Sequence, residues 1–140
     1  MKYIKDGDRY ILQLKKGELV IESLIKFAKE VDINTGEIRG IGAICNPGLA
    51  FYNSEAKNYI TQDFEGDFEI LSLMGNFSLK DDEVFPHLHI VLGKKDFSSI
   101  GGHLRECRVS GTLEIFIAPL NQQIKRAYDE ETALHLWDLK

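Results

Sequence analysis

The spacing of hydrophobic residues predicts one helix near the start of the chain and strands over most of the rest. Between residues 18 and 31, apolar side chains recur at intervals of three and four while glutamates and lysines occupy the other face, which is typical of an amphipathic helix. The acids lie toward its start and the lysines toward its end, as the helix dipole favours. Before it, residues 9–14 predict a first strand that ends at Lys15-Lys16-Gly17.

The middle of the chain is predicted to be strands joined by tight turns. Residues 37–45 alternate as a strand, Asn46-Pro47-Gly48 predicts a sharp turn, and residues 49–52 predict the return strand of a hairpin. Residues 59–62 predict another short strand. Residues 68–79 carry apolar side chains at both parities, which predicts a strand covered on both faces, either central in the sheet or at a subunit interface.

The last third of the chain continues this pattern. Residues 108–117 alternate cleanly between apolar and polar, which predicts a long half-buried strand. Two short segments, 124–128 and 133–137, finish the chain. Leu134 and Leu136 in the second of them are expected to pin the tail to the core.

Composition is that of an ordinary globular protein. The 140 residues fit a single domain, taken as 1–140, with 44% hydrophobic and 28% charged residues. No apolar run approaches the roughly 20 residues needed to cross a bilayer, and residues 1–8 lack the apolar region of a signal peptide. These features predict a cytoplasmic protein that does not associate with membranes.

Charge and cysteine content narrow the range of partners. Acidic residues outnumber basic ones, 22 to 17, giving a formal charge of −5, which argues against strong autonomous binding to nucleic acid. Cys45 and Cys107 each lie in a predicted strand without CxxC spacing. They are therefore expected to be buried, reduced thiols rather than a disulfide or a zinc knuckle.

Three of the four histidines fall close together in the sequence. His87 and His89 lie in a predicted strand, residues 84–92, on the parity opposite to its apolar positions. Side chains two residues apart on a strand project from the same face about 6.5–7 Å apart, so both imidazoles can reach one ion. Gly101-Gly102 lets the backbone pass close to that face and direct His103 inward. The pattern predicts a divalent metal site with an open position for water or a ligand.

A plainer interpretation of the same residues stays open. Histidines on one strand face can be partly exposed and hydrogen-bonded to carbonyls, and Gly101-Gly102-His103 can be only a turn. His135 lies beside Leu134, Leu136 and Trp137, and is expected to be exposed or to pack rather than to serve as a fourth ligand.

Three segments in order carry a more specific signal: residues 66–76 (GDFEILSLMGN), His87-Leu88-His89 and Gly101-Gly102-His103-Leu104. They resemble successive signatures of the plants-and-prokaryotes conserved (PPC) domain, in its stand-alone prokaryotic form, and the resemblance spans nearly the whole chain. It implies a single α/β domain with a mainly antiparallel sheet, one main helix and a homotrimeric assembly. It also implies a divalent metal, with zinc as the expected one, at the three histidines. Subunit contacts are implied near Phe68, Glu69, Ile70 and Leu71.

The chain departs from the plant members of this family. Those domains follow AT-hook segments in nuclear proteins that bind AT-rich DNA, and they typically carry arginine where this chain has Asp67. No Arg-Gly-Arg-Pro hook occurs in the sequence. Because minor-groove binding by such hooks depends on inserted arginines, the DNA function of the plant proteins does not transfer intact.

Three functions follow as hypotheses. The first is a homotrimeric binding or regulatory module whose metal takes a small anionic ligand, with Glu69 and Glu114 as carboxylates that orient the imidazoles. The second is a metal-dependent hydrolase or lyase acting on a small molecule; no motif marks its proton shuttle, and Glu69 is the carboxylate to test for that role. The third is a DNA-binding transcriptional regulator, in which trimerisation gathers basic side chains into one surface. These would be Lys94, Lys95, Arg105 and Arg108.

Overall fold

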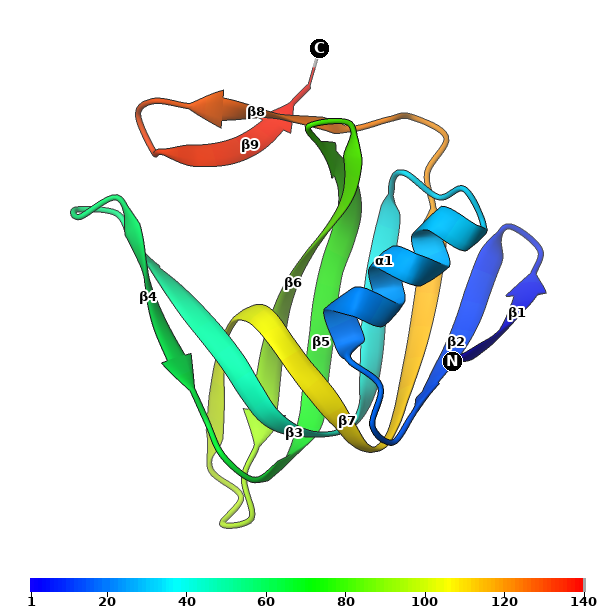
Figure 1. Cartoon of the computed structure of the whole chain (residues 1–140), viewed down its shortest axis with the longest axis vertical. Helices are drawn as coiled ribbons and strands as arrows, with labels where there is room; N and C mark the ends of the chain where they lie inside the picture. Colours follow the sequence, from blue (N-terminus) through cyan, green and yellow to red (C-terminus); the bar gives the residue numbers. More distant parts are fainter. Residues whose placement is uncertain (140) are drawn as a thin grey trace.

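Period-two patterning over most of the chain produces one strongly bent sheet, on which a single helix, α1 (Val20–Glu30), packs (Figure 1). The computed structural model describes residues 1–139. The strands are β1 (Lys2–Asp6), β2 (Arg9–Lys15), β3 (Gly36–Asn53), β4 (Asn58–Asp63), β5 (Asp67–Lys80), β6 (Glu83–Gly93), β7 (Ser99–Pro119), β8 (Lys125–Asp129) and β9 (Leu134–Asp138). The expectation of a single, mainly antiparallel α+β domain with one helix is confirmed for these residues.

Two long strands let the sheet close on itself. β7 pairs with β3 along most of its length, with β2 along its second half and with β6 over its first residues, and β3 in turn pairs with β5. Since β5 also pairs with β6, the strands β3, β5, β6 and β7 form a closed circuit of antiparallel ladders. One parallel contact, Leu79 with Lys125, ties β8 to this circuit.

The predicted helix is confirmed. Its apolar stripe, Val20, Leu24, Phe27 and Ala28, is buried in the core beside β6 and β7. No side chain of its own N-cap residue satisfies the free N–H groups of its first turn. The carboxylate of Glu106 on β7 does so instead, accepting hydrogen bonds from the backbone N–H of Ile21 at 2.9 Å and of Glu22 at 3.3 Å.

The expected hairpin at Asn46-Pro47-Gly48 is wrong. β3 continues through these residues to Asn53, and its register against β7 shifts on both sides of Gly48. Asn46 adopts a positive φ of 50°, and its side-chain oxygen accepts a hydrogen bond from the N–H of Gly66. Turn-forming residues here bend a continuous strand as a bulge does, instead of reversing it. The chain reverses later, through residues 54–57, into β4.

β5 is central, between β3 and β6, as predicted, but it is not covered on both faces within the chain. Its register against β6 shifts between Ile70 and Ser72, which marks a bulge at Leu71. The extra residue reverses the parity, so Ile70 and Leu73 both point into the core. Leu71 and Met74 are left 57% and 58% exposed on the outer face.

The two short segments of the tail form a hairpin, β8 and β9, which does not insert into the core. Leu134 and Leu136 instead line a cavity outside the closed circuit of strands, which corrects the expectation that they anchor the tail to the core. Cys45 and Cys107 are free thiols, as expected, but only Cys107 is buried, which raises its pKa to about 12, whereas Cys45 is partly exposed. No helix within residues 1–139 is long and apolar enough to span a membrane.

Candidate metal centre

β6 places two histidines on its outer face because its inner face is committed to the core. Leu88, Ile90 and Leu92 are buried, whereas His87 is half-buried and His89 is exposed. This is the alternation that the sequence predicts. The same pleat that buries the leucines therefore presents both imidazoles on the other side of the strand.

His103 reaches the same place from β7. It lies directly across from His89 in the ladder between β6 and β7, and across from Ala50 of β3 on its other side. A Cβ atom at Gly101 would lie 2.7 Å from the carbonyl oxygen of Ile90, and one at Gly102 would lie 2.9 Å from that of Ala50. The close backbone approach expected of the two glycines is confirmed, although they lie within a strand and not in a turn.

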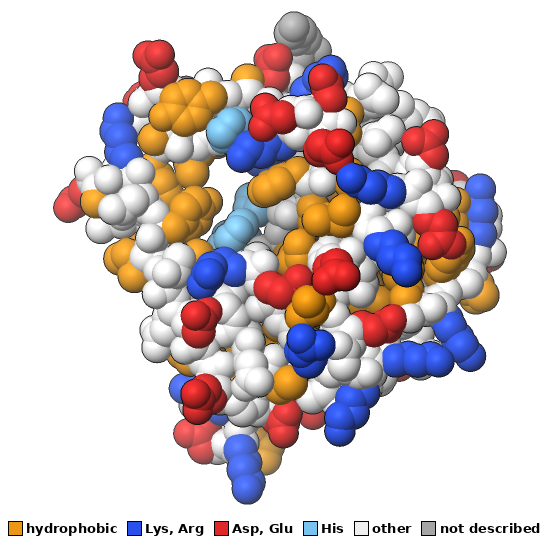
Figure 2. Space-filling view, in the orientation of Figure 1, with side chains coloured by type: hydrophobic (Ala, Val, Ile, Leu, Met, Phe, Trp, Pro, Cys, Tyr) orange, Lys and Arg blue, Asp and Glu red, His pale blue; other side chains and the backbone are white. Residues whose placement is uncertain are grey.

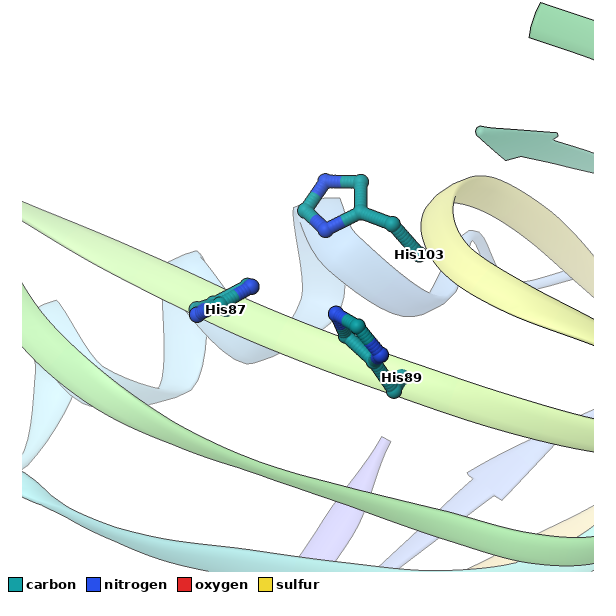
Figure 3. Close-up of side chains that lie close together, drawn as sticks. All are labelled: His87, His89 and His103. Atoms are coloured by element: carbon teal, nitrogen blue, oxygen red, sulfur yellow. The ribbon is translucent and has the colours of Figure 1, made fainter. Parts of the chain in front are cut away.

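The three rings face one space, two from β6 and one from β7 (Figure 3). One nitrogen from each of His87, His89 and His103 lies within 4.8 Å of the other two. Ring centroids are 5.2 Å apart for His87 with either partner and 5.7 Å apart for His89 with His103. Nitrogens bound to tetrahedral zinc at about 2.1 Å lie about 3.4 Å apart. Side-chain rotations that move the three nitrogens by about 1 Å would therefore bring them to this spacing.

The electrostatics of the cluster suit a cation-binding site. Burial, and after it the positive charge of Arg126, lowers the pKa of His87 to about 4, and burial together with His89 lowers that of His103. Both rings are therefore neutral at pH 7, which is the form that binds metal. Nδ1 of His103 is buried without a hydrogen-bond partner among the described residues. An unsatisfied buried polar atom is costly, and a metal ion bound there would satisfy it. The residues fit zinc.

Of the three clustered histidines, His87 and His103 line a cavity of about 260 Å³ (Figure 2, where histidine side chains lie in a hollow). Its walls come from β4, β5, β6, β7 and the β8–β9 hairpin. The lining residues are Tyr59, Lys80, Phe85, His87, His103, Arg126, Ala133, Leu134, His135 and Leu136. This lining contains two cations and no carboxylate.

Arg126 is the residue of this cavity that sequence reasoning missed. Its guanidinium lies 5.2 Å from the centre of the Phe85 ring. Nε donates to the hydroxyl of Ser78 and Nη1 to the carbonyl of His135, both at 2.8 Å. Nη2 lies 3.2 Å from Nδ1 of His87. No motif surrounds Arg126, and only the folding of the tail hairpin brings it to the histidines.

A family model of the Plants and Prokaryotes Conserved (PCC) domain matches residues 1–121. The chain belongs to this family. The family is the PPC family that the three sequence motifs indicate, and the match ends before β8, so Arg126 lies beyond it.

Solved structures similar to this PPC domain come from bacteria and archaea. A candidate DNA-binding protein from Bacteroides thetaiotaomicron is 34% identical with a TM-score of 0.94, over 98% of this chain and 96% of the other. A metal-containing protein from Archaeoglobus fulgidus is 36% identical with a TM-score of 0.88, over 95% and 94%. A plant- and prokaryote-conserved protein from Pyrococcus horikoshii is 33% identical with a TM-score of 0.88, over 96% and 93%. No curated protein matches the chain.

The carboxylates expected beside the histidines are elsewhere in the PPC domain. Glu69 lines a separate groove beside Asp67, and Glu114 lies on the outer sheet face next to Phe116. Neither lines the histidine cavity, so neither orients an imidazole or shuttles a proton there. His135 is not in the cluster, and its ring centroid lies 5.4 Å from that of Tyr128. It therefore packs against a neighbouring side chain, as its sequence context predicts.

The basic residues expected to form one surface are only partly together. Lys94, Lys95 and Arg108 line one groove of about 820 Å³, which also holds Asp67 and Glu69. Arg105 lies outside it, in an ion pair with Asp63 at 3.0 Å.

The segment expected to contact other subunits is split by its own alternation. Phe68 and Ile70 are buried in the core of the same chain, whereas Glu69 and Leu71 are exposed. Within one chain, only the second pair is available to a neighbouring copy.

Proposed function

We propose that this PPC domain is a homotrimeric binding module in which His87, His89 and His103 hold a divalent metal, with a small anionic ligand at the open coordination position. One observation carries the proposal: three imidazoles converge, and a buried nitrogen of one of them has no partner among the described residues. The metal would supply a Lewis-acidic position for the ligand. The similar protein from Archaeoglobus fulgidus, described as metal-containing, supports the metal.

Zinc is the metal we propose because the ligand set is made of imidazoles alone. Neutral nitrogen donors suit zinc and its neighbours, whereas magnesium and calcium require oxygen ligands. Three protein ligands with a free fourth position is also the arrangement that lets zinc bind a small molecule.

Elemental analysis of the protein purified without added metal tests this proposal, together with the His89→Ala variant. We expect about one zinc per chain in the wild type and almost none in the variant. His89 is exposed, so its loss should leave the fold intact by circular dichroism. The matched control is His135→Ala, which changes a histidine that lines the neighbouring cavity but lies outside the cluster. Equal metal content in His89→Ala and the wild type would contradict the site.

The trimer is part of the proposal, and the outer face of β5 supports it. Leu71 and Met74 are exposed there beside Ile41 of β3 and Phe116 of β7, so apolar side chains from three strands share one surface. A patch of this kind is typical of a protein–protein contact. Leu71 is the member that belongs to the segment expected at the interface.

Binding is favoured over the alternative of a metal-dependent hydrolase or lyase. Such an enzyme needs a group that moves protons beside the metal-bound water. No aspartate or glutamate is among the described residues that line the cavity. Turnover of small esters or phosphoesters that disappears with a chelator would favour the enzyme instead.

DNA binding is a second candidate. It is supported by the name of the similar protein from Bacteroides thetaiotaomicron and by the three basic residues that share one groove. Two acids in the same groove and the net charge of −5 weaken it. Binding to AT-rich duplex that persists at 150 mM salt would support it, whereas binding lost at that salt concentration would show only weak electrostatic attraction.

A further inference from the structure

The histidine cavity holds a positive charge that no carboxylate balances. Arg126 takes part in none of the ion pairs found within residues 1–139. Its partners are the hydroxyl of Ser78, the carbonyl of His135, the side-chain oxygen of Asn76, an imidazole and an aromatic ring, all of them neutral. Such partners satisfy hydrogen bonds but leave a partly desolvated charge uncompensated, which is unfavourable. The arrangement is suited to an anion that arrives from outside.

The remaining walls of the cavity point the same way. The chain has 22 acidic residues against 17 basic ones, yet no acidic residue among residues 1–139 lines this cavity, and Lys80 adds a second cation. Its ammonium lies 5.9 Å from the centre of the Phe85 ring, on which the Arg126 guanidinium also packs. Any anion that enters therefore meets positive charge without a competing internal carboxylate.

The contact between Arg126 and His87 constrains how metal can bind. A neutral imidazole has one N–H and one lone pair, and arginine can only donate. Because Nη2 of Arg126 lies 3.2 Å from Nδ1 of His87, that nitrogen carries the lone pair and Nε2 carries the proton. No second lone pair is left for a metal. If a metal binds Nδ1, it takes the lone pair that Arg126 uses; if it binds Nε2, the proton moves to Nδ1. In both cases the hydrogen bond from Arg126 is lost.

We propose that metal binding to His87 releases this guanidinium donor, and that Arg126 and the metal then hold the two oxygens of one small carboxylate. The inference rests on the metal site proposed above. It identifies the ligand class and makes the anion site dependent on the metal, because Arg126 is committed to His87 until the metal displaces it.

A carboxylate fits this cavity better than other anions. Its planar pair of oxygens matches the fork of guanidinium N–H groups. Phe85, Leu134 and Leu136 provide an apolar wall for a short hydrocarbon substituent, which inorganic phosphate lacks. The volume of about 260 Å³ lies below the range of pockets for drug-sized ligands, so the substituent is only a few carbon atoms long.

The test is calorimetric titration of zinc, and then of sodium butyrate, into the full chain, the Arg126→Gln variant and the Lys125→Gln control. Lys125 neighbours Arg126 on β8 but is exposed and pairs with Asp82. Arg126→Gln should bind zinc as tightly as the wild type or more tightly, because a competitor for the His87 lone pair is gone. Its affinity for butyrate in the zinc-loaded state should fall about tenfold to hundredfold, the effect of one charge-assisted hydrogen bond. Lys125→Gln should resemble the wild type in both titrations.

Reciprocity gives a second readout, because butyrate should tighten zinc binding in the wild type by the same factor as zinc tightens butyrate binding, and should do so by a smaller factor in Arg126→Gln, where only the metal still holds the carboxylate. The single tryptophan, Trp137, lies across from Arg126 in the β8–β9 ladder. Unchanged emission from Trp137 will show that the hairpin stays in place. Arg126→Lys, which keeps the charge but loses the fork, should bind butyrate with intermediate affinity.

Each of the other possible results would refute one part of the proposal. Zinc binding without any binding of butyrate refutes the anion site and leaves the metal site standing. Weaker zinc binding in Arg126→Gln alone refutes the competition and makes Arg126 a support for His87. Tighter binding of phosphate than of butyrate refutes the carboxylate class. Failure of the wild type to bind zinc refutes the metal site and this inference with it.

Discussion

Gly75 lies behind the proposed metal centre, and replacing it with alanine should displace the strand that carries two of the histidines. It faces Leu88 in the ladder between β5 and β6. A Cβ atom at this position would lie 1.9 Å from the carbonyl oxygen of His87 and 2.7 Å from Cδ2 of Leu88. Nonbonded heavy atoms pack at about 3.5 Å, so the two strands must separate by about 1.5 Å. Both belong to the closed circuit, which prevents β5 from absorbing the whole movement.

The magnitude decides the expected result. Metal sites tolerate errors in ligand distance of about 0.2 Å, several times less than the required separation, so Gly75→Ala should lose most of its zinc. Overpacking of this kind costs about 1–3 kcal/mol, which is less than the total stability of a typical domain. The variant should therefore remain folded, with a Tm lower by roughly 4–12 °C.

Elemental analysis of dialysed protein and thermal melts followed by circular dichroism measure both effects. Gly111→Ala is the matched control, because it also adds a methyl group within a strand, and that methyl group meets only Cβ of Ala43 at an ordinary 3.4 Å. It should keep both its zinc and its Tm. A Gly75→Ala protein that retains one zinc per chain and the wild-type Tm would refute the packing argument.

Four further changes test other parts of the structure. Leu71→Asp should convert trimers to monomers in light scattering, whereas Ile60→Asp, equally 57% exposed but on β4, should not; equal effects would contradict the assignment of the interface. Phe68→Asp should instead unfold the chain, since the ring is buried and a charge there costs several kcal/mol; a folded monomer would argue otherwise. Replacement of Glu106 by Gln should lower stability to urea by about 1 kcal/mol through the weakened cap of α1. The Cys107 thiol stays protonated up to about pH 12 in the folded state but loses its proton near pH 9 once unfolded, so stability should fall as the pH rises above 9, by about 1 kcal/mol at pH 10. Cys107→Ala should show a smaller loss between pH 8 and pH 10, and an unchanged loss would contradict the burial effect.

The parts of the fold that the sequence predicts well are those with an unbroken period. α1 is amphipathic over its whole length, and β6 alternates without interruption, so both were predicted with the correct faces. β1 was not predicted, because every residue of this edge strand is exposed and no apolar pattern marks it. It exists because β2 offers it a free ladder to pair with.

Bulges account for the errors in the middle of the chain. One extra residue at Leu71 puts Ile70 and Leu73 on the same face. In a sequence, this is indistinguishable from a strand that is apolar on both faces. Asn46-Pro47-Gly48 has the composition of a turn, yet β3 stays paired with β7 on both sides of it. Local composition marks a change of direction, whereas long-range pairing decides whether that change is a bend or a reversal.

The candidate site shows the same division between local and long-range information. Strand period places His87 beside His89, and the glycines before His103 permit the close approach that brings the third ring across from them. Arg126 is 23 residues further along the chain and reaches the cavity only because the tail hairpin folds back over β5. No periodicity links it to the histidines.

This division has a consequence for specificity within the family. β6 commits one face to the core and the other to the histidines, so the metal centre lies on the outside of the closed circuit and its strands cannot enclose a ligand by themselves. The enclosing walls come from β4 and from the β8–β9 hairpin, and the hairpin lies beyond the residues that the family model matches. Changes in the hairpin can therefore alter the shape and charge of the cavity without disturbing either the closed circuit of strands or the three histidines. On this reasoning, domains that share the histidines should differ in ligand according to what their tail places where Arg126 lies here.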